Sequence, residues 1–483
     1  MTLFKHDPIF NHRVLAIMDE GREIDYQDID GYVQKLKGVV QPRTLCFILC
    51  ENKADVLLFY LAALRMDAVP LLLNDNISSE ALRELINLYR PAFLLSGLDH
   101  EEINQMALCL GRIEFITTET VLYRIDWPEQ PPLHPDLALL LTTSGSTGSS
   151  KVVRLSKCNL QSNAEAIAQY LELEEDDRPV TTLPMSYTYG LSVIHSHLLV
   201  GATLLLTTKS VTERGFWEFC QENKGTSLAG VPYTYEMMDR LKIDLEQYPY
   251  IRTLTQAGGH LSEALQERYA QWSSQDRRRF VIMYGQTEAT ARMAYLPPEA
   301  IQRKLGSIGI PIPGGAFELV DTDGSRIEGD CQRGELVYTG PNVAMGYAEC
   351  AQDLVKGDEW QGRLCTGDLA KRDSEGYYYI VGRKSRFVKL YGYRVSLDEI
   401  ENNLTAHFPG YSFACIGHDA QKDLVIFTTD RAPKTETAVT NALVELTRLP
   451  SSVFKVYAVE AIPMNASGKK DYVRLEKRYH GKD

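Results

Sequence analysis

Residues 137–151 are LALLLTTSGSTGSSK, an apolar run that passes directly into a loop of serine, threonine and glycine. The apolar half predicts a short buried strand. In the other half, glycine lets the backbone approach a ligand closely, and hydroxyls with bare amides form a donor surface for phosphate oxygens. Gly145 and Gly148 are too close together for a Walker A loop, which has four residues between its glycines. The segment predicts either a phosphate-binding loop, with Lys151 as its positive charge, or a flexible polar surface loop.

The composition is that of a globular protein with an acidic surface. The chain has 483 residues, of which 44% are hydrophobic, and its 51 basic and 64 acidic residues give a net charge of −13. We expect neither nucleic acid nor a membrane as partner, because both favour a surplus of Lys and Arg and no segment is long enough to span a bilayer. The N-terminus lacks a signal peptide's apolar core, and the nine cysteines are scattered, so we expect a reducing, cytoplasmic location. No zinc pattern occurs, and His195 and His197 are expected to be structural.

Strands alternate with helices over roughly the first 310 residues. Apolar runs predict strands at 43–49, 69–73 and 91–96, and helical periodicity occurs at 54–66 and 79–89. This alternation predicts an α/β fold in which helices cover a parallel sheet. Two later runs, at 254–257 and 280–284, are followed by glycine and polar residues. Ligands gather at such strand ends in α/β sheets.

The pattern changes at about residue 310, where short strands and turns replace helices. We expect a small β-barrel-like part over about 310–383. Beyond Gly382-Arg383, a capping box at 396–399 opens a helix, and strands and helices then form a compact α+β domain of about 100 residues. The predicted organisation is a large domain, 1–383, and a small C-terminal domain, 384–483.

Five motifs follow one another along the chain. They are the loop ending at Lys151, Tyr284-Gly285-Gln286-Thr287-Glu288, Thr366-Gly367-Asp368, Gly382-Arg383 with Lys389 and Gly392, and Gly468-Lys469. In this order they resemble the ANL superfamily of adenylate-forming enzymes, which comprises acyl- and aryl-CoA synthetases, peptide-synthetase adenylation domains and luciferases. The resemblance spans nearly the whole chain. It implies an AMP-binding N-terminal domain and a mobile C-terminal domain with a catalytic lysine.

The resemblance implies a reaction in two steps. A carboxylate attacks the α-phosphate of ATP and pyrophosphate leaves; the acyl group then passes to a thiol after the C-terminal domain rotates. Because two anions meet in the first step, the barrier is largely electrostatic, and Mg²⁺ would neutralise phosphate charge. The implied cofactors are ATP and Mg²⁺, with coenzyme A or a phosphopantetheine as co-substrate.

The same resemblance implies roles for individual residues. Lys469 would bridge the carboxylate and the α-phosphate, Thr287 would contact the α-phosphate, and Glu288 would position Mg²⁺. Asp368 and Arg383 would contact the ribose. The adenine would be framed by Gly258, Gly259 and Tyr284. The β- and γ-phosphates would be held by Thr143, Ser144, Gly145, Ser146, Thr147, Gly148 and Lys151. The hinge and thioester step would involve Ser385, Lys389 and Gly392.

Two departures from the family pattern concern the hinge and the substrate. The hinge position, usually Asp or Lys, is Ser385. The predicted substrate pocket consists of Tyr187, Thr188, Tyr189 and His260. Peptide-synthetase domains carry an Asp in this aromatic segment to hold the substrate's α-amine, and Thr188 cannot form that charge pair. We therefore favour a fatty, aryl or other amine-free acid, while Tyr187 and Tyr189 fit core packing equally well.

The thiol acceptor stays open at this stage. Residues 391–401 are more similar to the carrier-loading branch of the family, and an acyl or peptidyl carrier protein would then act in trans, but coenzyme A is almost as well supported. The alternatives are an amino-acid adenylating enzyme that loads a carrier protein, an oxidative enzyme of the luciferase kind, and a nucleotide-binding regulator without catalysis. Lys469, Glu288 and Asp368 argue against the regulator.

Overall fold

The computed structural model describes residues 2–5, 7–142, 151–275, 277–384, 386–390, 393–418, 423–432, 434–447, 449–465 and 469–479. The chain forms two compact units, one comprising Met1–Ala316 and Tyr338–Leu364, the other Phe317–Val337 and Cys365–Asp483. Each unit is defined by the contacts among its own residues. The domain boundary at residue 384, which was inferred from the sequence pattern, stays a prediction.

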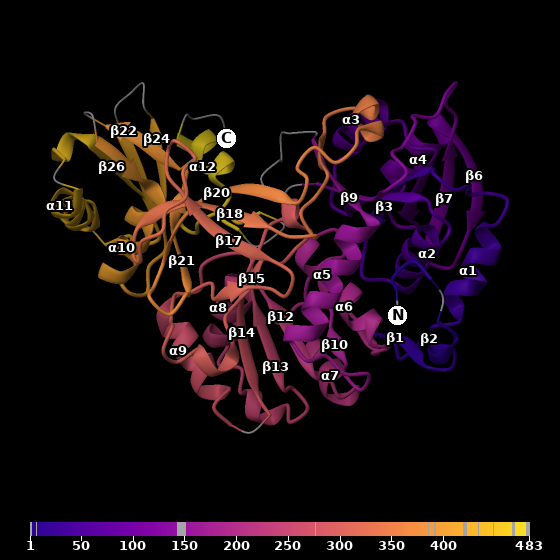
Figure 1. The fold of residues 1–483 in the computed structure, drawn as a ribbon, viewed down its shortest axis with the longest axis horizontal. Coiled ribbons are helices and arrows are strands. Elements are labelled where there is room, and N and C mark those ends of the chain that lie inside the picture. Colours follow the sequence, from indigo (N-terminus) through magenta and orange to yellow (C-terminus); the bar gives the residue numbers. More distant parts are fainter. Residues whose placement is uncertain are drawn as a thin grey trace. The chain divides into compact units, whose positions relative to one another are not determined.

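A nine-stranded sheet is the first of two large sheets in the first unit (Figure 1). Its order is β16 (Ile310–Pro311), β15 (Ala294–Tyr295), β14 (Arg279–Tyr284), β13 (Thr253–Gln256), β12 (Ser227–Gly230), β10 (Pro179–Val180), β11 (Leu204–Leu206), β1 (Val14–Met18) and β2 (Glu23–Asp25). Strands β12, β13 and β14 pair in parallel, as predicted, and the pairs β1–β2, β14–β15 and β15–β16 are antiparallel.

The second large sheet has eight strands. Its order is β19 (Gly346–Ala348), β9 (Val152–Ser156), β8 (Leu137–Thr142), β4 (Val69–Asn74), β3 (Leu45–Cys50), β5 (Phe93–Gly97), β7 (Thr120–Ile125) and β6 (Gly111–Ile116). The pairs β8–β4, β4–β3 and β3–β5 are parallel. The centre of the sheet is parallel, as predicted, whereas the pairs at both edges are antiparallel, which the alternation of strands and helices did not indicate. Short hairpin connections, such as the one between β6 and β7, make antiparallel pairing possible.

Helices cover both sheets of the first unit. They are α1 (Asp28–Leu36), α2 (Ala54–Arg65), α3 (Ser79–Tyr89), α4 (Glu101–Leu110), α5 (Lys157–Tyr170), α6 (Thr188–Leu199), α7 (Arg214–Glu222), α8 (Pro232–Arg240) and α9 (Glu263–Trp272). One apolar core contains residues of both sheets together with α2, α5 and α6, and a second core lies under α3 and α4. Alternate residues of β3 enter these two cores, which explains its continuous apolar sequence.

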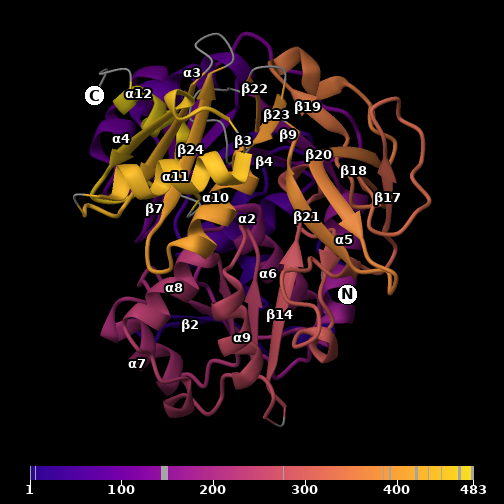
Figure 2. The ribbon, with the colours of Figure 1, turned by 90° about the vertical axis from the view of Figure 1, so that its left-hand side faces the viewer.

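The second unit contains three smaller sheets. A four-stranded sheet, β17 (Ala316–Val320), β18 (Arg333–Thr339), β20 (Arg363–Arg372) and β21 (Tyr378–Arg383), occupies the predicted β-rich part. The others are β22 (Phe387–Leu390) with β23 (Tyr393–Ser396), and β24 (Phe413–His418), β25 (Asp423–Thr428) and β26 (Phe454–Ala458). Helices α10 (Leu397–His407) and α11 (Thr435–Thr447) pack on one face of the β24–β26 sheet, and α12 (Tyr472–Tyr479) packs on the other (Figure 2).

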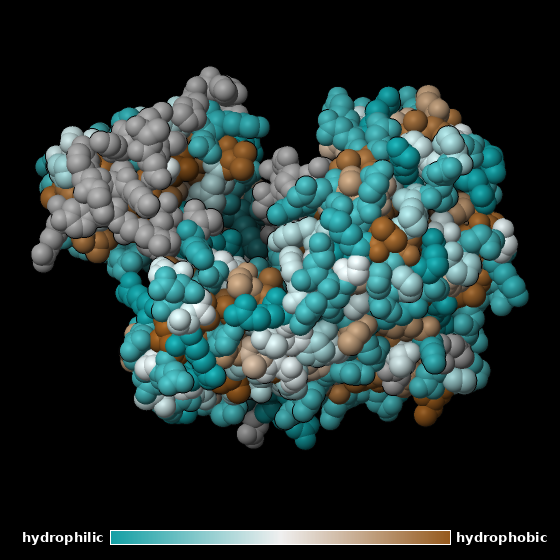
Figure 3. Space-filling view, turned by 45° about the horizontal axis from the view of Figure 1, so that its top comes forward, coloured by the Kyte–Doolittle hydropathy of each residue, from teal (hydrophilic) through white to brown (hydrophobic). Residues whose placement is uncertain are grey.

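The exposed surface is mainly hydrophilic on the face drawn in Figure 3, where apolar side chains form small scattered patches. Within the described ranges, no helix has both the length and the apolar character needed to cross a membrane.

Arg154 on β9 fixes the edge strand β19 to the second large sheet. Its guanidinium is fully buried and donates to the carbonyl oxygens of Tyr347 (3.0 Å), Met345 (3.2 Å) and Gly357 (3.1 Å). It also donates to the Glu359 carboxylate at 2.5 Å. One buried side chain therefore joins β9 to β19 and to the segment that follows β19 through several hydrogen bonds.

We expect Arg154→Met to lower the free energy of unfolding by about 3 kcal/mol, because it removes several hydrogen bonds at once, one of them to a carboxylate. Thermal and urea unfolding would measure the loss. Arg214→Met is the matched control, since Arg214 is 91% exposed and only pairs with Glu218 on the surface of α7. The control should change stability by less than about 1 kcal/mol. Equal losses in both variants would contradict the role given to Arg154.

Candidate active site

The two ends of the predicted phosphate loop lie side by side. Strands β8 and β9 pair antiparallel, with Thr142 opposite Val152, and Lys151 directly precedes β9. The predicted loop residues Thr143, Ser144, Gly145, Ser146, Thr147 and Gly148 lie outside the described residues, so their role stays a prediction. The structure places Lys151 at the edge of the sheet, where β19 adds to β9.

Tyr347 connects Lys151 with Glu288. The Lys151 ammonium lies 4.0 Å from the centre of the Tyr347 ring, and the Tyr347 hydroxyl donates to Glu288 Oε1 at 2.7 Å. Burial raises the pKa of Tyr347, and the negative charge of Glu288 raises it further, so the phenol stays a proton donor. Tyr347 lies opposite Val153 in the β9–β19 pair and packs edge-on against Trp360. This arrangement holds a cation and a carboxylate on one aromatic side chain.

The Glu288 carboxylate fits the role of a magnesium ligand. Among the residues that the structure describes, Tyr347 is its one hydrogen-bond partner, and that bond uses Oε1. Oε2 is thus left for a cation, and carboxylate oxygen is the ligand that Mg²⁺ prefers. Thr287, the neighbouring predicted phosphate contact, is buried in the same short 3-10 turn, Thr287–Ala289.

Asn342 fixes the segment that carries Glu288. Its buried amide nitrogen donates to the carbonyl oxygens of Ala289 (2.8 Å) and Arg292 (2.9 Å). The Ala344 backbone amide donates to the Glu288 carbonyl at 2.9 Å. Sequence analysis missed both Asn342 and Tyr347. The dipeptide Gly340-Pro341 signals a turn there, but no local pattern shows which distant segment the turn contacts.

Two predicted glycines lie where a side chain does not fit. A Cβ on Gly285 would lie 1.7 Å from the Ala291 carbonyl oxygen. At Gly258 the backbone has φ +86°, and a Cβ would lie 2.6 Å from the Tyr187 hydroxyl. The turn after β14 therefore depends on a close approach of two backbone segments, and the turn after β13 on close packing of the Tyr187 side chain and a positive φ. Tyr284, at the end of β14, is half-buried. Gly259 is exposed in the first of these turns.

The predicted substrate residues at the start of α6 differ in their surroundings. Tyr187 is half-buried, and burial raises its pKa to about 12. Thr188 is buried and donates to the Thr290 carbonyl at 2.5 Å, and Tyr189 is buried and donates to the Thr255 carbonyl at 2.8 Å. The Tyr189 hydroxyl thus has a hydrogen-bond partner within the core, and its position needs no substrate contact to explain it. His260 is exposed in the turn after β13.

In the second unit, the structure brings Asp368 and Arg383 together. They lie opposite each other on β20 and β21, and Arg383 Nε is 3.1 Å from Asp368 Oδ1. Asp368 is buried, and its backbone amide donates to Thr366 Oγ1, which in turn donates to the Leu336 carbonyl at 2.7 Å. The carboxylate is therefore held rigidly on paired strands.

The predicted catalytic lysine lies in a short turn before α12. The Lys469 backbone amide donates to Asn465 Oδ1 at 3.0 Å, and the Asn465 amide donates to the Lys469 carbonyl at 2.7 Å. Next to it, the Lys470 ammonium donates to buried Glu401 at 2.6 Å, which anchors the turn to α10. Of the predicted hinge residues, Lys389 lies on β22 opposite Arg394. Ser385 and Gly392 lie outside the described residues.

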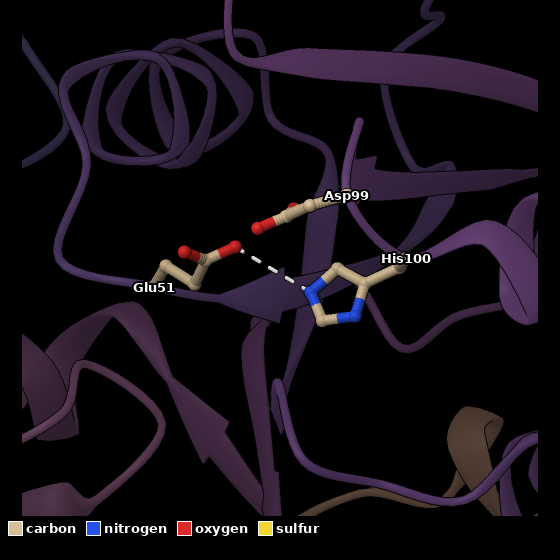
Figure 4. A group of neighbouring side chains, drawn as sticks. All are labelled: Glu51, Asp99 and His100. Carbon is tan, nitrogen blue, oxygen red and sulfur yellow. Dashed lines mark ion pairs between the residues drawn. The ribbon is translucent and has the colours of Figure 1, made fainter.

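A separate charged cluster lies at the ends of β3 and β5 (Figure 4). Glu51, Asp99 and His100 approach one another there, with His100 Nε2 at 3.4 Å from Glu51 Oε1. The Lys53 ammonium lies 2.6 Å from Glu51 Oε2 and 3.7 Å from Asp99 Oδ2. Because this lysine already supplies the positive charge, we interpret the group as an ion-pair cluster.

Comparisons with known proteins agree with the motifs. Residues 11–348 match the model of a family described as AMP-binding enzyme. The chain is 28% identical over 412 residues to indoleacetate–CoA ligase of Aromatoleum aromaticum, which covers 80% of this chain and 79% of the relative. It is 26% identical over 454 residues to oxalate–CoA ligase of Arabidopsis thaliana, with 89% and 87% covered.

Among solved structures, ATP-bound MatB from Rhodopseudomonas palustris has the same fold. The TM-score is 0.80 at 23% identity, and the match covers 100% of this chain and 98% of that chain. The predicted fold class, a large α/β part followed by a small C-terminal α+β part, is confirmed.

We expect Gly285→Ala to destabilise the protein and to abolish adenine-nucleotide binding, because its methyl group would overlap the Ala291 carbonyl. Thermal unfolding and nucleotide titration would measure both effects. Gly31→Ala is the control: Gly31 lies in α1 and a Cβ there meets nothing within 4 Å. The control should gain roughly 0.5–1 kcal/mol, because alanine is the better helix former. Equal nucleotide affinity in both variants would show that the close approach is not required.

Proposed function

Because this chain belongs to the family of AMP-binding enzymes and is an adenylate-forming ligase, we propose that it activates a carboxylic acid with ATP. The acyl-adenylate forms with release of pyrophosphate, and the acyl group then passes to the thiol of coenzyme A. The observation that carries the proposal is the convergence of Lys151 and Glu288 on Tyr347 beside the paired ends of the phosphate loop.

The arrangement in the first unit suits a reaction between two anions. A carboxylate that attacks a phosphate needs positive charge fixed in advance, and Lys151 supplies one such charge. Mg²⁺, when bound, would neutralise phosphate charge, and Glu288 Oε2 would hold it. Thr287 would donate its hydroxyl to the α-phosphate. The hydrogen bond from Tyr347 keeps the Glu288 carboxylate oriented.

In the second unit, Asp368 would accept hydrogen bonds from the ribose hydroxyls while Arg383 balances its charge. Lys469 would stabilise the charge that develops between the attacking carboxylate and the α-phosphate.

The acid is proposed to lack an α-amine. Thr188 has no charge, and its hydroxyl already donates to the Thr290 carbonyl. The relatives named above act on indoleacetate and oxalate, neither of which is an amino acid. Both are named as CoA ligases, which favours coenzyme A over a carrier protein as acceptor.

The proposed function predicts ATP–pyrophosphate exchange that depends on an amine-free carboxylic acid. A panel of fatty, aryl, dicarboxylic and amino acids would identify the class, and thioester formation would then be measured with coenzyme A and with a phosphopantetheinylated carrier protein. Exchange with amino acids alone, or thioester formation on the carrier alone, would overturn the corresponding part of the proposal. Nucleotide binding without any exchange would favour a regulator.

We expect Tyr347→Phe to lower kcat/KM for exchange roughly tenfold and to raise the Mg²⁺ concentration needed for half the maximal rate. The variant keeps the ring under Lys151 but removes a hydrogen bond to a carboxylate, which contributes about 1.5–3 kcal/mol. Tyr250→Phe serves as the control, because Tyr250 is exposed and keeps its ring contact with Lys224. An unchanged Mg²⁺ requirement in Tyr347→Phe would remove the support for Glu288 as the metal ligand.

Lys469→Ala should reduce the exchange rate by about 10²–10³-fold, the usual cost of removing one fixed donor to a transition state. Nucleotide binding should persist. Lys477→Ala, on the exposed face of α12, should behave as wild type. The same exchange rate in the Lys469 and Lys477 variants would exclude Lys469 from the adenylation step.

A further inference from the structure

Arg292 is a buried cation in the first unit. It is 2% exposed, and no Asp or Glu among the described residues forms an ion pair with it. Its Nε donates to the Met283 sulfur at 3.3 Å, and its guanidinium lies 3.8 Å from the centre of the Tyr189 ring. A thioether and a ring face compensate a buried charge far less well than a carboxylate does, so this guanidinium lacks its natural counter-ion.

The side chains around Arg292 are aromatic and neutral. The Tyr170 hydroxyl donates to the Met283 sulfur at 3.0 Å, the same sulfur that Arg292 contacts, and Tyr295 stacks on Tyr170 at 4.3 Å between ring centres. Burial raises the pKa of Tyr170, Tyr187 and Tyr189, and the positive charge of Arg292 opposes this only in part. The tyrosines therefore offer hydroxyl groups and no negative charge. Tyr170, Tyr187 and Tyr295 are only half-buried, so the cluster reaches the surface.

The backbone of Arg292 is held in place by two asparagine side chains. Its carbonyl oxygen accepts from Asn163 Nδ2 at 3.0 Å and from Asn342 Nδ2 at 2.9 Å. It follows the proposed magnesium ligand Glu288 by four residues, and its charge acts on Tyr187, whose hydroxyl lies against Gly258. The guanidinium thus lies between the proposed catalytic segment and the residues predicted to bind the acid.

We propose that Arg292 binds a second carboxylate on the acid substrate, so that this enzyme activates dicarboxylic acids in preference to monocarboxylic acids of the same length. The inference rests on the adenylation proposed above and adds the substrate class. One carboxylate attacks the α-phosphate, and the other forms paired hydrogen bonds with the guanidinium, whose planar fork matches that geometry. The Tyr187 hydroxyl, next to Gly258, would supply a further donor. Sequence analysis missed Arg292, although a single charge in the apolar run from Ala289 to Leu296 is a detectable signal.

The test compares matched acids in ATP–pyrophosphate exchange. The pairs are succinate with butanoate, glutarate with pentanoate, and isophthalate with benzoate, and 4-sulfobutanoate tests whether any second anion suffices. Wild type should prefer the diacid of at least one pair by roughly 100-fold or more in kcat/KM, the range seen when one partner of a buried charge pair is lost. A wild-type enzyme that uses the monoacids equally well would overturn the inference without touching the proposed function.

Three variants separate the charge of Arg292 from its packing. Arg292→Met should abolish the diacid preference while nucleotide binding and the activity with monoacids persist, and Arg292→Lys should keep part of the preference. Arg240→Met, on the exposed end of α8, should match wild type. An unchanged diacid-to-monoacid ratio in Arg292→Met would refute the inference.

A direct binding measurement separates failure of the inference from failure of the proposed function. If no acid supports exchange, the adenylation proposal fails, and thermal shift with the diacids then examines Arg292 alone. Stabilisation of wild type by a diacid, but not of Arg292→Met, would still support an anion site. The absence of such a difference would reject it.

Discussion

The hydrogen bond from the Tyr347 hydroxyl to Glu288 joins three segments that are far apart in the sequence. Tyr347 belongs to β19, which pairs with β9 at one end of the predicted phosphate loop, and Glu288 lies in the turn after β14. Because β9 and β14 belong to different sheets, this contact ties the phosphate end of one sheet to the strand end of the other. The proposed electrostatic chemistry depends on that junction, since Lys151 and Glu288 both contact Tyr347 there.

Two other arginines with largely buried side chains have carboxylate partners. Arg154 is bonded to four carbonyls and to Glu359, and Arg386 is paired with Asp398 and Glu401. Arg292 differs from these two arginines, because no carboxylate among the described residues pairs with it. Local conflicts of this kind are expected at functional sites, and Arg292 is therefore a candidate ligand-binding residue. This contrast separates a structural arginine from one that receives a ligand.

The predictable part of the fold lies in the regular patterns. The continuous apolar run of β3 correctly predicts a strand, and the amphipathic pattern of α3 correctly predicts a helix. A strand buried on both faces and a helix buried along one stripe each have a characteristic spacing of apolar residues. The antiparallel pairing of β6, β7 and β19 was not predicted. These strands pair with whichever edge of the sheet is unpaired, and that is known only once the other strands have assembled. In the site, Thr287, Glu288 and Asp368 are recognisable from motifs, while Tyr347 and Asn342 are not.

The sequence by itself determined the order of the motifs, the alternation of strands and helices, and thereby the family. These features can be recognised in the sequence because they depend on neighbouring residues, on turn chemistry and on periodic burial. Only the tertiary structure decided that Lys151, Tyr347 and Glu288 converge, that Asn342 holds the segment after β14, and that Arg292 is buried without a carboxylate. Each of these depends on packing between segments separated by many residues. Whether a charged side chain has a partner is decided only when the chain folds.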